Sequence, residues 1–287
     1  MQYKHILLFI GILSISCTKN SASQDTLNTV LEFPKKLSEV SGMVVIDRLI
    51  WVIEDSGNDT KIFGLSSDGE IKATLTLQNT TNQDWEDLTK DSQNNLYIGD
   101  FSNNANNRKD LCIYKIQAAD LNSSEVNSKE IIRFYYPEQT DFPPKKNELF
   151  YDCEAFFEFN GSFYLITKNR SKGFDGTTYV YKVPNKAGTH AAQLLGKFKT
   201  CETFNSCAIT GATISPDGKK VVLLSHSKLW LFEDFEADAF LNGKVTMLEL
   251  NHSSQKESVC FKDATTLLIA DERTKKIGGK VYEYSLR

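Results

Sequence analysis

The fold is decided by the stretch Asp84-Trp85-Glu86-Asp87-Leu88 and by the run NLYIGD that follows it at residues 95–100. Together they contain a carboxylate, a short apolar strand, a turn, a second apolar strand and a second carboxylate, with Asp100 lying 14 residues after Glu86. Such a pattern predicts a β-hairpin. Its recurrence matters more than the hairpin itself, because a period of about 20–50 residues indicates a repeat architecture.

Four further copies of this module occur in the chain. Each pairs a polar residue with another one 14 positions later, except for one copy with a gap of 15, where a Pro-Asp-Gly turn at 216–218 takes up the extra residue. The five pairs are Ser41 and Asp55, Glu86 and Asp100, Glu154 and Lys168, Thr210 and Ser225, and Glu257 and Asp271. The copies start 45, 68, 56 and 47 residues apart, which is typical of propeller blades with loops of variable length.

Further strand patterns complete each repeat to four strands, except for the last one. The last copy is followed only by VYEYSL at 281–286, whereas TVLEF at 29–33 is a strand with nothing before it to pair with. We therefore predict an all-β fold, a five-bladed β-propeller of four-stranded antiparallel blades whose last blade is closed by the N-terminal strand. This closure removes the free sheet edges. Six blades are the alternative, if a loop hides a degenerate blade.

The composition is that of a soluble globular protein, with 40% hydrophobic and 24% charged residues among 287. The formal net charge is −4, so we predict no nucleic-acid binding, which needs a basic surface. The repeats favour a single propeller domain at 28–287, and we expect a monomer.

Residues 1–17 resemble a signal peptide. A Lys-His pair precedes an apolar run at 6–15 that is too short for a comfortable membrane span. Cys17 then follows as in a bacterial lipobox, although Ser14 departs from the usual pattern. We expect a lipid on Cys17, a flexible tether at 18–27 and a location in the cell envelope, at the outer membrane because no Asp follows Cys17. Plain cleavage and an unprocessed N-terminus are the alternatives.

The other cysteines do not indicate a metal site, because no Cys/His spacing fits zinc. Cys201 and Cys207 bracket a short loop, and in an exported protein they either form a disulfide or stay free. Cys112 and Cys260 lie in apolar strands and are expected in the core.

The repeat predicts two rings of polar side chains at one end of the channel. The first strand of each blade lines the channel, and its start lies beside the end of the antiparallel second strand. The inner ring consists of Ser41, Glu86, Glu154, Thr210 and Glu257, and the outer ring of Asp55, Asp100, Lys168, Ser225 and Asp271. Carboxylates this close raise one another's pKa or require a cation. An all-oxygen set suits calcium, so we predict calcium at the inner ring; the alternative is a wide channel with solvated acids.

The loops of the same face carry cationic side chains. We expect Arg108, Lys168, Arg170 and Arg273 to bind an anionic ligand that also contacts the metal. The simpler explanation is that exposed loops are rich in Lys, Asn and Gly. Candidates for a catalytic acid or base are Asp55, Asp100, His226, Asp271 and Glu272, but no spacing selects one of them.

Several motifs resemble those of a known group of bacterial propellers. They are EVSG at 39–42, EDSGN at 54–58, DWEDL at 84–88, IGDFSNN at 98–104 with Arg108, ITKNRS at 166–171 and ADER at 270–273. This set, which covers residues 38–286, is similar to the phytase-like and SdiA-regulated propellers. The inner ring resembles that of the five-bladed calcium-activated nucleotidases (apyrases), in which a Ser, Glu, Glu, Ser, Glu series holds a central calcium. Ser41, Glu86, Glu154 and Glu257 match this series, and Thr210 replaces the second Ser.

Two functions follow from these observations. The first is an exported, lipid-anchored binding or scaffold module with a structural calcium ion, whose partner is an anionic small molecule or an envelope protein. The second is a calcium-dependent phosphohydrolase acting on nucleotides or phosphate esters. The absence of an identifiable nucleophile or base favours the first, since propellers host both functions. A lactonase of the gluconolactonase type comes third, because its mixed Glu/Asn/Asp metal set is missing.

Overall fold

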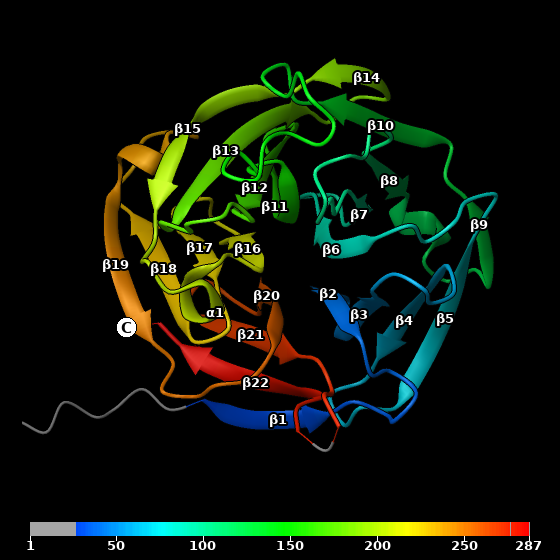
Figure 1. The fold of residues 1–287 in the computed structure, drawn as a ribbon. Helices are drawn as coiled ribbons and strands as arrows, with labels where there is room; N and C mark the ends of the chain where they lie inside the picture. The colour runs from blue at the N-terminus through cyan, green and yellow to red at the C-terminus, as the bar shows by residue number, and fades with distance from the viewer. Residues whose placement is uncertain (1–26, 276, 287) are drawn as a thin grey trace, which may run out of the picture.

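The computed structural model describes residues 27–275 and 277–286, in which the strands form five sheets around a central axis (Figure 1). The first two blades contain β2 (Val40–Ile46), β3 (Leu49–Glu54), β4 (Lys61–Leu65) and β5 (Ile71–Gln78), then β6 (Trp85–Lys90), β7 (Leu96–Asp100), β8 (Cys112–Ile116) and β10 (Glu130–Tyr135). The third and fourth contain β11 (Asp152–Phe159), β12 (Ser162–Lys168), β13 (Thr177–Pro184) and β15 (Gln193–Lys199), then β16 (Gly211–Ile214), β17 (Val221–Leu224), β18 (Lys228–Glu233) and β19 (Lys244–Glu249). The fifth contains β20 (Lys256–Phe261), β21 (Thr266–Asp271), β22 (Lys280–Ser285) and β1 (Asn28–Glu32). The predicted five-bladed propeller is confirmed.

The last blade is closed by the N-terminal strand, also as predicted. β1 pairs antiparallel with β22, and the two lie side by side at the bottom of Figure 1 although they come from opposite ends of the chain. Leu31 and Phe33 carry the closure into the core, because their side chains are buried among residues of the first and fifth blades. The predicted signal peptide, Cys17 and most of the predicted tether lie outside the described residues.

Two blades have a fifth strand that the sequence did not predict. β9 (Glu125–Asn127) pairs parallel with β5, and β14 (Gly188–Ala191) pairs parallel with β10. Each is a segment of the following blade laid against the outer edge of the preceding one. The four antiparallel strands predicted for each blade are present, and the sequence did not reveal the two added strands because EVN and GTHA are too short and too polar to read as strands.

Helix is nearly absent from the described chain. It is limited to η1 (Ala118–Asp120), α1 (Phe204–Cys207) and η2 (Phe240–Asn242). None of these elements has the length or the apolar character needed to cross a membrane.

The inner strands β2, β6, β11, β16 and β20 contact one another in this order and close a ring around the axis. Ser41 Oγ donates a hydrogen bond to Trp85 O of the next blade (2.7 Å), and Thr210 Oγ1 donates one to Lys256 O (2.7 Å). The strands approach so closely that a Cβ atom on Gly42 would lie 2.6 Å from the amide nitrogen of Leu88. The ring residues thus also hold neighbouring blades together.

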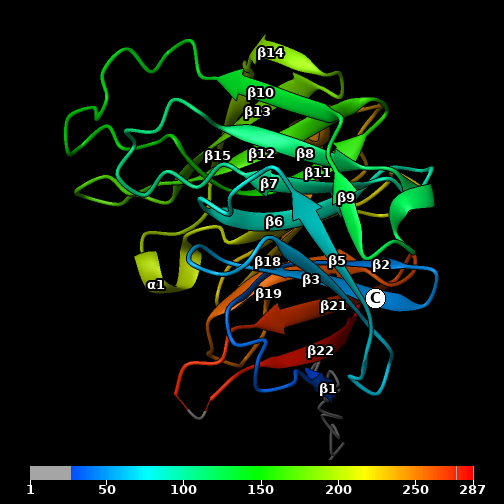
Figure 2. The same cartoon turned by 90° about the vertical axis from the view of Figure 1, so that its right-hand side faces the viewer.

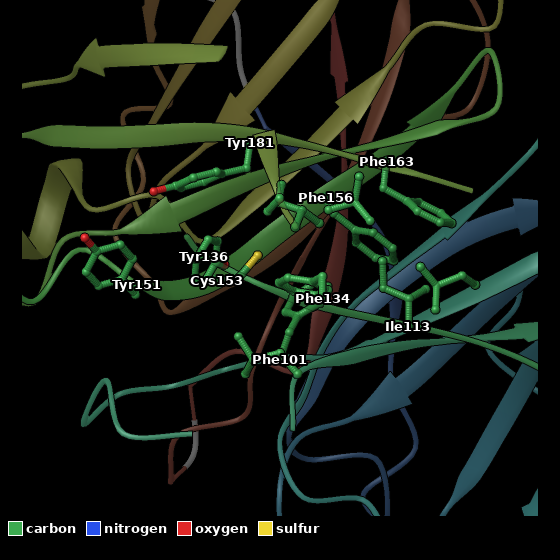
Figure 3. Packing of buried hydrophobic residues seen from close by; sticks show 14 of the residues in the cluster. Phe101, Ile113, Phe134, Tyr136, Tyr151, Cys153, Phe156, Phe163 and Tyr181 are labelled. Atoms are coloured by element: carbon green, nitrogen blue, oxygen red, sulfur yellow. The ribbon is translucent and has the colours of Figure 1, made fainter. Parts of the chain in front are cut away.

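The hydrophobic core consists of five clusters, each shared by two neighbouring blades. Figure 3 shows the one between the second and third blades, where Phe101 packs edge-on against Phe156 with ring centroids 5.1 Å apart. Because every cluster takes side chains from both blades, the blades stabilise one another and the ring folds as one unit.

The closure of the ring predicts that Phe33→Ala destabilises the whole propeller. Truncation of a fully buried Phe costs about 3–5 kcal/mol of unfolding free energy, and Phe33 is only 1% exposed. Chemical denaturation followed by fluorescence should show this loss in a single transition. Val30→Ala is the matched control, because Val30 is 43% exposed in the same segment and its truncation should have little effect. A separate early transition would contradict the role of the closure.

Candidate functional site

A cavity of about 310 Å³ opens at the axis of the propeller. All five blades and their loops contribute to its wall: Ser41, Asp55, Glu86, Asn104, Glu154, Lys168, Arg170, Phe204, Ala208, His226, Gln255, Glu257 and Glu272. Figure 2 shows that α1 and the long loops project from one side of the sheets. Since Phe204 lies in α1 and Asn104 in one of these loops, this is the face on which the cavity lies.

The residues of the predicted inner ring reach the cavity because most of them lie in β-bulges. Val40 pairs with Glu54 and Gly42 with Ile53, so Ser41 is an extra residue without a partner in the ladder. Glu86, Glu154 and Glu257 are extra residues in the same way. A bulge re-aims a side chain and bends the strand, which places these four in the cavity wall. Thr210, which precedes β16 without a bulge, is not part of the wall.

On the third blade, the acids of the cavity are neutralised by the protein itself. Glu154 accepts hydrogen bonds from Lys168 Nζ (2.9 Å) and Arg170 Nη2 (2.6 Å), and Arg170 Nε also binds Asp152 (2.5 Å). Burial alone would raise the pKa of Glu154, but Lys168 and Arg170 outweigh it and hold that pKa below its ordinary value. Two acids and two cations therefore form an internally neutral group.

Between the first and second blades the acids are not neutralised. Glu86 is only 9% exposed and faces the cavity, yet it makes no hydrogen bond or ion pair with another residue of the described chain. Carboxylate oxygens of Asp55, Asp84 and Glu86 all lie within 4.8 Å of one another. Burial, and then the neighbouring carboxylates, raise the pKa of Glu86 well above its ordinary value and that of Asp55 to about 7. This group, the Asp55–Asp84–Glu86 cluster, has the charge and the oxygen donors to hold a cation.

Asn82 brings this cluster together across the blade boundary. Its Nδ2 donates to the carbonyl oxygens of Glu54 (3.0 Å) and Asp55 (2.8 Å), and its Oδ1 accepts from the Trp85 amide (3.0 Å). The end of β3 is thereby fixed beside the start of β6. Asn82 and Asp84 are not among the predicted site residues, because neither occupies the repeated position of the module.

Several predicted site residues lie outside the cavity wall and make bonds that stabilise the fold. Asp100 accepts the backbone amide of Asp84 (3.3 Å) and pairs with Arg108 (2.8 Å), so these two support the segment before β6. Asp271 accepts hydrogen bonds from the Lys280 amide (2.9 Å) and the Tyr282 hydroxyl (2.8 Å).

Arg273 and Ser225 also make structural bonds. Arg273 donates to Phe33 O (2.9 Å) at the closure of the ring. Ser225 Oγ donates to Ser206 O (2.7 Å) and so fixes the end of α1.

The wall formed by the fourth and fifth blades carries a histidine–glutamate pair. His226 Nε2 lies 3.2 Å from Glu257 Oε1. The loop of His226 is held by the fully buried Lys256, whose Nζ donates to His226 O (3.0 Å). Beside this pair, burial and then the charges of Glu257 and Asp55 raise the pKa of Glu272 to about 8.

The rim of the cavity includes an aromatic side chain that the sequence analysis also missed. Phe204 in α1 is 37% exposed, and the guanidinium of Arg170 lies 5.9 Å from its ring centroid. Cys201 and Cys207 form a disulfide around this short helix. Of the two alternatives for these cysteines, disulfide or free thiols, the disulfide is confirmed. Cys112 and Cys260 are free and buried, as predicted.

Comparisons with known proteins support the fold alone. Neither the protein-family models nor the curated protein sequences match this chain. Among solved structures, the chain resembles the PQQ-bound aldose sugar dehydrogenase from Streptomyces coelicolor, with a TM-score of 0.53 and 9% identity over 91% of this chain and 97% of that chain. A catalytically inactive virginiamycin B lyase from Staphylococcus aureus in complex with quinupristin gives a TM-score of 0.42 and 16% identity, over 89% of this chain and 69% of that one.

The raised pKa of Glu272 predicts that the metal-free protein loses stability as the pH rises from about 5 to about 8. Over this range the folded state keeps a proton that the unfolded state, with an ordinary pKa of 4.5, has released. The unfolded state therefore binds fewer protons, and the free energy of unfolding falls with rising pH. Thermal melting in the presence of a chelator should show this fall, and Glu272→Gln should make it shallower. The exposed Glu125→Gln is the control; equal slopes in all three proteins would contradict the assignment.

Proposed function

We propose that this propeller is a binding module of the cell envelope whose central cavity takes a calcium ion and, through it, an anionic group of a ligand or partner. The observation that carries the proposal is Glu86, a buried carboxylate that faces the cavity and has no hydrogen-bond or ion-pair partner among the described residues. A buried charge without compensation is costly, so it is protonated or attracts a cation.

The balance of charge in the cavity supports a cation. Its wall contains five carboxyl groups but only two permanent cations, Lys168 and Arg170, and these already pair with Glu154 and Asp152. The remaining donors near Glu86 are oxygens, which suit calcium, since this ion takes 6–8 oxygen ligands and accepts water among them. An anion alone would be repelled by this excess of acids. An anion that binds to the metal would have its charge compensated by the metal.

Calcium titration tests the proposal. Calorimetry on the purified chain should show calcium binding, and calcium should raise the melting temperature, because a ligand that binds only the folded state stabilises it. Glu86→Gln keeps the shape but removes the charge, and it should weaken binding at least about tenfold, or about 1.4 kcal/mol. Glu125→Gln, on the exposed strand β9, should bind as the parent does. Absence of binding in the parent protein would refute the proposal.

A second candidate function is a calcium-dependent phosphohydrolase, and the His226–Glu257 pair favours it. A histidine whose ring nitrogen faces a glutamate in a cavity wall is arranged as a general base that the carboxylate orients. If this function holds, calcium should switch on phosphate release from nucleotides or phytate, and His226→Ala, Glu86→Gln and Glu154→Gln should each abolish it. Calcium binding without any turnover over a panel of phosphate esters would leave the binding module as the function.

A further inference from the structure

We propose that the cation lies off the propeller axis, at the Asp55–Asp84–Glu86 cluster between the first two blades, and that Lys168 is a built-in counter-ion that keeps the axis free of metal. This inference rests on the proposed function and locates its metal. The proposed metal site differs from the inner ring that the repeat predicts, because Glu86 is the one residue that belongs to both.

The axial ring fits a cation poorly because one of its carboxylates is already saturated. Both oxygens of Glu154 are engaged, one by Lys168 Nζ and the other by Arg170 Nη2. Lys168 occupies the repeat position that holds Asp55 in the first blade, and its side chain is only 7% exposed as part of the cavity wall. A divalent ion on the axis would therefore lie beside a buried ammonium group.

The other ring members add little to an axial site. The hydroxyls of Ser41 and Thr210 bond to backbone carbonyls of neighbouring blades, and Thr210 does not reach the cavity wall. Glu257 lies within 3.2 Å of His226. Of the five ring residues, Glu86 alone among the acids has no partner in the described chain.

The off-axis cluster has the dimensions of a calcium site. Two oxygens bound to one calcium at about 2.3–2.6 Å can lie at most about 5 Å apart, and the carboxylate oxygens of the cluster lie within 4.8 Å of one another. The segments that carry them come from two blades and are fixed by Asn82 through three hydrogen bonds. Little ordering is thus needed for binding, and Glu86, which has no partner within residues 27–275 and 277–286, faces the cavity.

Two conservative variants separate the two sites, because each removes a charge that belongs to only one of them. Asp84→Asn affects the off-axis cluster, and Glu257→Gln affects the axial ring. Calorimetry of the full chain with calcium chloride should show that Asp84→Asn weakens binding at least about tenfold, while Glu257→Gln stays near the parent value. The reverse order would overturn the inference and leave calcium binding itself intact. No binding in the parent chain would instead refute the proposed function.

The role of Lys168 is tested by two single variants and one double variant. Lys168→Met removes the counter-ion and should create a second, axial calcium site, seen as a rise in stoichiometry from one to two; Glu154→Gln added to this variant should abolish the second site. Lys168→Arg keeps the charge and should bind one ion. Thermal melting of each variant establishes that it is folded. Stoichiometry that stays at one in a folded Lys168→Met protein would overturn the role of Lys168.

Discussion

The β-bulge at the start of the inner strand is the constraint on which the rest of the site depends. In four blades one residue is left out of the ladder, and this residue is the polar one that the repeat carries: Ser41, Glu86, Glu154 and Glu257. The bulge explains why a polar side chain can stand in a strand that is otherwise buried on both faces.

Neighbouring inner strands bond to one another beside these bulges. Ser41 bonds to the next blade, and Asp87, which follows the bulged Glu86, accepts the Phe156 amide of the third blade at 3.1 Å. The residues that surround the site therefore also connect neighbouring blades. A change that removed a bulge would move a cavity side chain and loosen a blade contact at once.

The sequence predicts the fold well because period, spacing and the apolar pattern are local properties. It predicts the place of a polar ring but not which charges neutralise one another there. Lys168 and Asp55 occupy equivalent repeat positions, yet the long side chain of Lys168 reaches back to Glu154, whereas Asp55 is too short to do so and joins a group across the blade boundary. Asp100 and Asp271 have the same sequence spacing, but in the ladder they pair with Trp85 and Lys256, directly before the bulge, and accept backbone amides of loops. Such choices depend on loop conformation, which no period describes.

The cavity shows how the function of a repeat protein arises from departures between its repeats. Five identical blades would place five equal charges around the axis, and their repulsion would demand one central ion. Here the third blade neutralises its own acid with Lys168 and Arg170, the fifth places its acid beside His226, and the fourth has only a hydroxyl. Carboxyl groups without a paired cation in the described chain therefore remain at the Asp55–Asp84–Glu86 cluster and at Glu272. If the cluster holds an ion as proposed, the cavity lies beside that ion, and an anionic group entering past Phe204 would meet the metal on one side and the Lys168–Arg170 group on the other.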